Sequence, residues 1–140
     1  MFIASKEEIV LEINKINTYL KECLWMDFTI SNSNWGEVNL YGTIDQTHNN
    51  YIDNYDIKIT FEYPYFISTL LSFTSDNSKK FVHLCTEKEQ DKIIEKYKVE
   101  AENFIFKINI EDFEVSPIII AAKNIKCEII NENPFSNNKQ

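Results

Sequence analysis

The clearest hydrophobic pattern in the chain lies between Phe104 and Ile110, where every second residue is apolar. This period of two is typical of a β-strand with one buried face. Segment 111–117, with several acidic residues and a proline, has the composition of a turn. A second apolar run covers residues 118–130. Together the two runs predict a central β-hairpin.

The second run changes its parity near Lys123 and Asn124. Ile118, Ile120 and Ala122 share one parity, whereas Ile125, Cys127 and Ile129 share the other. A β-bulge with one extra residue would return the apolar side chains to the core, and asparagine tolerates the backbone angles that a bulge requires. The alternative is a strand that is buried on both faces in its first half and has no bulge. The polar Lys126 and Glu128 favour the bulge.

Two capping boxes mark the starts of predicted helices: Ser5 with Glu8, and Thr86 with Glu89. Apolar residues behind the first box fall on one helical stripe, formed by Ile9, Ile13, Ile16 and Leu20. This stripe predicts a helix over about residues 6–22 that lies on a sheet. Its polar face is not basic, which argues against a membrane anchor. The second box predicts a short helix that ends near residue 97.

Between the helices, alternating or apolar segments separated by turn residues predict five further strands. They cover residues 26–31, 37–44, 55–63, 66–74 and 81–85. The predicted fold is α+β: an N-terminal helix packed on a curved, mainly antiparallel sheet of six to seven strands, with a short second helix before the C-terminal hairpin. Residues 1–130 are expected to form one globular domain, and the polar residues 131–140 a flexible tail.

Composition places the protein among globular proteins, because 44% of its 140 residues are hydrophobic. Its three cysteines lie within apolar patterns and are odd in number, which is typical of reduced thiols. The N-terminus lacks the pattern of a signal peptide, and no apolar run is long enough to span a membrane. With the abundance of isoleucine, asparagine and lysine, these features predict a location in the bacterial cytoplasm.

The charge balance of the chain favours some classes of binding partner over others. Fourteen lysines, no arginine and 22 acidic residues give a net charge of −8. Arginine is the usual reader of phosphates and guanine edges, so an acidic chain without it argues against nucleic-acid binding. The same charge favours a basic protein partner. Alternatively, the acidity serves only to keep the protein soluble.

Motifs for catalysis or cofactor binding are scarce. With only Gly36 and Gly42, the chain has no dinucleotide fingerprint, P-loop or nucleophile elbow. His48 lies near two aspartates and could ligate a metal, but a solvated loop histidine is the simpler interpretation. His83 and Cys85 would share one strand face, yet a cysteine flanked by apolar residues is more often structural than nucleophilic. We therefore predict no catalytic residues, no metal site and no cofactor.

Aromatic residues outside the expected core are more informative. Trp25, Trp35, Tyr41, Tyr51, Tyr63 and Tyr65 fall on outward parity or in loops. The longest polar connection is Asp45–Asp56, and loops held by a rigid sheet are where binding residues concentrate. Tyrosine beside carboxylate suits a lysine- or arginine-rich partner. The predicted partner-binding residues are therefore Tyr51, Asp53, Tyr55 and Asp56, together with Trp35 and Tyr41.

This profile resembles that of the immunity proteins of bacterial polymorphic toxin systems, which are small, acidic, cytoplasmic, aromatic-rich and α+β, without catalytic motifs. The resemblance lies in the profile and assigns no individual residue. It implies a non-catalytic module that neutralises a basic toxin or enzyme. The alternative is a small-molecule-binding domain, or a weak enzyme, with a pocket inside the curved sheet lined by residues such as Phe61, Phe104 and Phe106. A filled core with an acidic, aromatic surface would favour protein binding.

Overall fold

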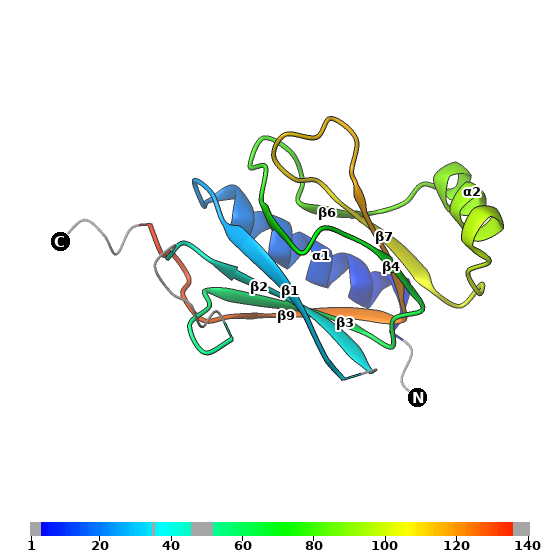
Figure 1. The fold of residues 1–140 in the computed structure, drawn as a ribbon, viewed down its shortest axis with the longest axis horizontal. Helices are drawn as coiled ribbons and strands as arrows, with labels where there is room; N and C mark the ends of the chain where they lie inside the picture. The colour runs from blue at the N-terminus through cyan, green and yellow to red at the C-terminus, as the bar shows by residue number, and fades with distance from the viewer. Residues whose placement is uncertain (1–3, 35, 46–51, 136–140) are drawn as a thin grey trace.

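The computed structural model describes residues 4–34, 36–45 and 52–135 of the chain. Within these residues the chain forms two helices and nine strands (Figure 1). In chain order they are α1 (Lys6–Lys21), β1 (Asp27–Asn34), β2 (Glu37–Thr43), β3 (Ile57–Glu62), β4 (Phe66–Ser68), β5 (Ser72–Thr74), β6 (Val82–Leu84), α2 (Glu87–Tyr97), β7 (Phe104–Ile108), β8 (Ile118–Ala122) and β9 (Asn124–Ile129).

The strands form two antiparallel sheets that do not close into a barrel. The five-stranded sheet has the order β5-β1-β2-β3-β9, and the four-stranded sheet has the order β4-β8-β7-β6. The predicted α+β class, with an N-terminal helix and antiparallel strands, is confirmed. The strands are divided between two sheets instead of forming one, because two of the predicted strands each contribute to both sheets.

The C-terminal hairpin shows how one predicted strand divides. β7 and β8 pair antiparallel as predicted, with Phe106 opposite Ile120. At Lys123 the chain leaves the four-stranded sheet and continues as β9, which pairs with β3 in the other sheet. The predicted bulge is therefore wrong. The parity changes because Lys123 lies between β8 and β9 and belongs to neither strand, so this one residue shifts the alternation of core-facing side chains.

β8 matches the alternative of a strand buried on both faces. Ile118, Ile120 and Ala122 belong to the main core, and Ala121 belongs to a second cluster with Ile93 of α2. The predicted strand 66–74 divides in the same way as the return strand: β4 pairs with β8, whereas β5 pairs with β1.

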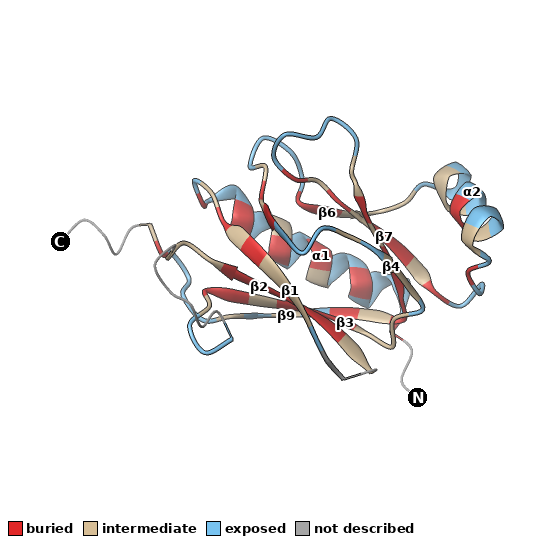
Figure 2. Cartoon of the chain, in the orientation of Figure 1, coloured by how far each residue is buried: buried red, intermediate tan, exposed pale blue. Residues whose placement is uncertain are grey.

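Aromatic rings and the apolar face of helix α1 fill the main core. Figure 2 shows the buried positions along α1 and along the strands. The ring of Phe28 stacks on those of Phe73 and Phe81, with centroids 5.7 and 4.7 Å away. The apolar stripe predicted on α1 is buried, and Tyr19 is buried beside it. Both predicted capping boxes are present, so the two helices begin where the sequence placed them.

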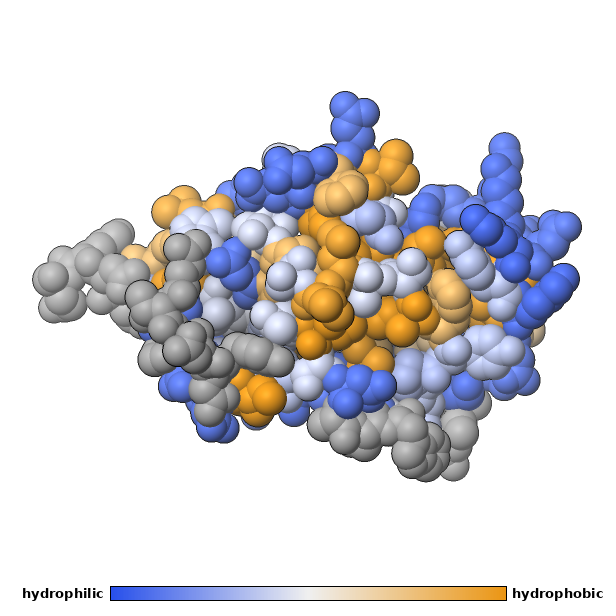
Figure 3. All heavy atoms as spheres, in the orientation of Figure 1, coloured by the Kyte–Doolittle hydropathy of each residue, from blue (hydrophilic) through white to orange (hydrophobic). Residues whose placement is uncertain are grey.

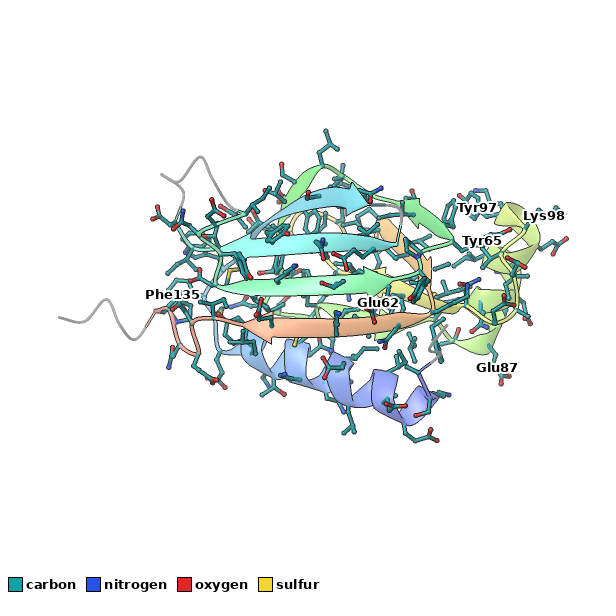
Figure 4. The ribbon with its side chains drawn as sticks, turned by 90° about the horizontal axis from the view of Figure 1, so that it is seen from below. Glu62, Tyr65, Glu87, Tyr97, Lys98 and Phe135 are labelled. Atoms are coloured by element: carbon teal, nitrogen blue, oxygen red, sulfur yellow. The ribbon has the colours of Figure 1, made fainter. Side chains whose placement is uncertain are left out.

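Polar side chains of α1 pair with the free edges of both sheets. The Asn17 amide donates to the Val82 carbonyl of β6 at 2.8 Å and accepts from the Val82 N–H at 3.0 Å. A Glu12 carboxylate oxygen accepts from the Cys127 N–H of β9 at 3.0 Å. Figure 4 shows α1 running alongside β9. The helix thereby joins the two sheets and satisfies edge groups that would otherwise lack partners. No helix in the described ranges has the length and apolar character needed to cross a membrane.

Candidate functional site

The structure gathers part of the predicted binding loop into a hollow of about 280 Å³. We call it the acidic hollow; the described residues that line it are Thr43, Ile44, Asp45, Asp53, Asn54, Tyr55, Asp56, Ile130 and Asn131. Its position follows from strand order. β2 and β9 flank β3 in the sheet, so the end of β2, the start of β3 and the exit from β9 meet at one end of the sheet.

The charge of the acidic hollow is one-sided. Asp45, Asp53 and Asp56 belong to its described lining, and no lysine does. Asp53 is exposed, whereas Asp56 is buried. Carboxylates that surround one concave surface reinforce each other's attraction for a cation, and a low-dielectric wall strengthens the effect. The hollow therefore favours a positively charged group.

Asp56 forms the base of the acidic hollow and is only 6% exposed. Its Oδ2 accepts from the Ile44 N–H at 2.9 Å, and its Oδ1 accepts from the Asn131 side-chain amide at 2.5 Å. Its backbone carbonyl accepts from the Ile130 N–H at 2.8 Å. Because the carboxylate is buried and accepts hydrogen bonds from within the chain, Asp56 shapes the hollow. Its predicted contact with a partner stays a prediction.

Tyr55 lies at the side of the hollow and is half-buried. Its hydroxyl donates to the Glu128 carboxylate at 2.6 Å. This hydrogen bond, aided by partial burial, raises the pKa of Tyr55 to about 12, because the carboxylate favours the protonated phenol. The Tyr55 ring meets the Tyr41 ring edge-on, with the centroids 5.2 Å apart. Tyr55 is thus held in place by strands β2 and β9.

Tyr41, like Asp56, is far less exposed than its predicted role as a contact residue requires. It is 6% exposed, and the Lys58 ammonium lies 5.6 Å from the centre of its ring. The predicted outward parity does not expose it, because cross-strand neighbours cover it. Tyr41 therefore supports Tyr55 and offers little surface of its own. Tyr51 and Trp35 lie outside the described residues.

Six residues of the described lining were not among the predicted contact residues, and two of them, Ile130 and Asn131, come from the distant segment just after β9. Ile130 is 52% exposed, and Asn131 holds Asp56. The sequence placed both at the junction of the last strand and the tail. No local signal connects them with a loop some 75 positions away; only the pairing of β3 with β9 brings them to it. Nearby, Phe135 packs edge-on against Trp25 with the centroids 5.8 Å apart.

Other predicted aromatic residues lie at the far end of the molecule. Figure 4 shows Tyr65, Tyr97 and Lys98 beside α2, opposite the end that carries Phe135. The Tyr65 hydroxyl donates to the Lys98 carbonyl at 3.0 Å, and Phe66 stacks on Tyr97 with the centroids 4.3 Å apart. These rings attach α2 to the four-stranded sheet, and this packing role accounts for their position without a bound ligand.

The His83–Cys85 pair lacks the features of an activated nucleophile. Burial raises the pKa of the Cys85 thiol to about 11 and lowers the pKa of His83. Near neutral pH the thiol is therefore protonated and a poor nucleophile. All three cysteines are free, and the described ranges contain no group of three or more histidine, cysteine or acidic side chains placed to hold a metal ion. His48 lies outside these ranges.

Side chains fill the space inside the curved sheet where the alternative hypothesis placed a ligand pocket. Phe61 and Phe106 are fully buried and meet edge-on with ring centroids 5.2 Å apart. Phe104 packs beside Phe106 at 6.5 Å. Figure 3 shows hydrophobic side chains gathering instead near the middle of one outer face, where the β4–β5 connection runs. In that connection Leu71 is 81% exposed.

Comparison of the chain with protein-family models, with curated proteins and with solved structures finds no match.

Proposed function

We propose that this protein is a non-catalytic binding module that captures a basic protein partner at the acidic hollow. The observation that carries the proposal is the composition of the hollow, whose described lining supplies three aspartates and no lysine. The net charge of −8 supports it, because the long-range field would steer a basic partner toward the protein.

The contacts of the hollow suggest how a partner would be recognised. A lysine or arginine side chain would place its charge near Asp45 and Asp53, with the Tyr55 ring alongside it. The exposed Ile52 and Ile130 would add apolar contact area beside the charges. Specific interfaces combine an apolar centre with a polar rim, and this end of the molecule offers both.

The specific role that we propose is that of an immunity protein, which neutralises a basic toxin or enzyme in the bacterial cytoplasm. The acidity, the aromatic content and the α+β fold support this role by their resemblance to that class. The core filled by Phe61 and Phe106 favours a binding surface over an internal ligand pocket.

The test begins with a pull-down from cells that produce the protein, followed by binding kinetics of the purified partner. The test variant is Asp45→Asn with Asp53→Asn. We expect it to fold normally and to bind about tenfold more weakly, a loss of about 1.4 kcal/mol, chiefly through a slower on-rate. Raising the salt from about 50 to 300 mM should slow association of the wild type, because it shortens the Debye length.

The matched control is Asp91→Asn with Glu95→Gln, two exposed acidic residues of α2. It removes the same charge away from the hollow and should bind like the wild type. Equal weakening by both variants would show that the net charge of the protein, and not the acidic hollow, determines binding. A test variant that binds like the wild type would refute the hollow as the binding site. For the immunity role, the captured partner should arrest growth when expressed alone, and co-expression of the wild-type protein should restore growth.

A further inference from the structure

A second concave surface lies between α1 and the turn that precedes β6. It has a volume of about 340 Å³, and we call it the lysine groove. The described residues that line it are Asn14, Asn17, Thr18, Lys21, Asn77, Ser78, Lys79 and Lys80. It shares no lining residue with the acidic hollow.

The lining of the lysine groove is opposite in charge to the chain as a whole. Acidic residues outnumber lysines by 22 to 14 in the sequence. The described lining nevertheless contains three lysines, no acidic residue and no apolar residue. Ligand pockets are usually lined mostly by apolar side chains, so an entirely polar, cationic lining suits a hydrophilic anion.

Hydrogen bonds hold both walls of the groove. On one wall Asn17 is bonded to the backbone of Val82 in both directions, at 2.8 and 3.0 Å. On the other wall the Asn77 amide donates to the Cys23 carbonyl at 3.3 Å. The first contact joins α1 to β6, and the second joins the turn to the segment just after α1, so the groove is formed before any ligand enters it. Pre-formed geometry lowers the cost of binding.

The nearest carboxylate of the turn is engaged in that turn. Asp76 accepts from the N–H of Ser78 at 3.0 Å and from its hydroxyl at 2.6 Å. These two hydrogen bonds lower the pKa of Asp76. Its charge is thereby directed at the backbone of the turn, and Asp76 does not belong to the described lining of the groove.

Several donors of the groove remain available for a ligand. The ammonium groups of Lys21 and Lys80 form no hydrogen bond or ion pair with other residues of the described ranges. The backbone carbonyl of Lys80 accepts from the Asn109 side-chain amide at 2.8 Å, which fixes the turn and leaves the ammonium group available. Lys79 donates to the carbonyls of Phe113 and Glu114, both at 3.3 Å, and an ammonium group has a third N–H. Asn14 and Thr18 supply neutral polar groups on the helix wall.

We infer that the lysine groove binds a small phosphorylated molecule. Lysine ammonium groups are established binders of phosphate as point charges. The volume lies at the low end of the range of about 300–1,000 Å³ for small-molecule sites, which leaves room for a sugar-sized group next to a phosphate. Asn14 and Thr18 would pair with hydroxyl groups of that part. Lys21 also offsets the partial negative charge of the helix C-terminus, which would otherwise repel an anion.

The experiment is an NMR titration of the full chain with inorganic phosphate, glucose 6-phosphate and glucose, followed at the amides of the groove. The test variant is Lys21→Ala with Lys80→Ala. The matched control is Lys88→Ala with Lys92→Ala, two exposed lysines of α2. Thermal melts of both variants establish that the fold is retained.

We expect saturable shifts with both phosphate compounds, tighter binding of glucose 6-phosphate, and no binding of glucose. The test variant should bind about tenfold more weakly, and the control within about twofold of the wild type. Absence of saturable binding, or equal weakening in both variants, would overturn the site. Equal affinity for phosphate and glucose 6-phosphate would overturn the role of Asn14 and Thr18 and with it the assigned ligand class.

Discussion

Removal of the Asp56 side chain should destabilise the whole domain, although the residue lies at the edge of a polar loop. In the wild type its two carboxylate oxygens accept from the Ile44 N–H and the Asn131 amide. Asp56→Ala deletes both acceptors. The two donors then lose their acceptors, and water that enters the hollow replaces them only in part.

The size of the effect follows from these two contacts. An unsatisfied buried donor costs about 1–3 kcal/mol, and hydrogen bonds to charged groups are at the upper end of the usual range. Partial access of water to the hollow reduces the sum, so we expect a loss of about 2–4 kcal/mol in the free energy of unfolding. For a domain of this size, that corresponds to a fall in melting temperature of roughly 5–15 °C.

The assay is urea unfolding followed by circular dichroism, combined with hydrogen exchange. The control is Asp91→Ala, which removes an exposed carboxylate from α2 and should change stability by less than about 0.5 kcal/mol. The Ile44 and Ile130 amides should lose more protection from hydrogen exchange than the Leu40 amide in the centre of β2, because the hydrogen bonds around Asp56 open locally first. A decrease of less than about 1 kcal/mol in the free energy of unfolding of Asp56→Ala would refute the structural role of the Asp56 hydrogen bonds, and so would a uniform loss of amide protection.

Two further predictions concern the core and the hollow. Phe106→Ala should cost about 3–5 kcal/mol in denaturant melts, because it empties a fully buried site; the exposed Leu71→Ala should cost less than about 0.5 kcal/mol, and a small effect of the first change would contradict the central hairpin. Titration of the Tyr55 phenol, followed by ultraviolet absorbance, should show a pKa of about 12 that falls toward the usual value in Glu128→Gln. Because the pKa of Tyr55 is higher in the folded state than in the unfolded state, its hydrogen bond to Glu128 stabilises the fold fully below the unfolded-state pKa near 10. This stabilisation is lost as the pH rises through about 12. An unchanged titration of Tyr55 in Glu128→Gln would show that Glu128 does not cause the shift.

Local features of this fold could be predicted from the sequence because their contacts are local. Each capping box joins residues three positions apart, such as Ser5 and Glu8, and the buried stripe of α1 repeats with the helical period. The alternation of β7 likewise reports the burial of its own side chains. The sequence also located the change at Lys123 correctly, because the reversal of parity is visible in the residues themselves.

The meaning of that change was decided by the tertiary structure. A parity reversal fits a bulge within one strand as well as a crossing between two sheets, and only the partners of β8 and β9 distinguish them. The same holds for the surfaces. The sequence singled out the loop that bears Asp53 and Tyr55, but it did not reveal the hydrogen bond from Asn131 to Asp56, which joins residues 75 positions apart. The lysine groove lies between α1 and residues 77–80, and the contact that holds α1 against the adjoining strand β6 is between Asn17 and Val82, which are 65 positions apart. Such sites arise where sheet order and helix packing bring distant residues together, and no periodicity in the chain encodes that proximity.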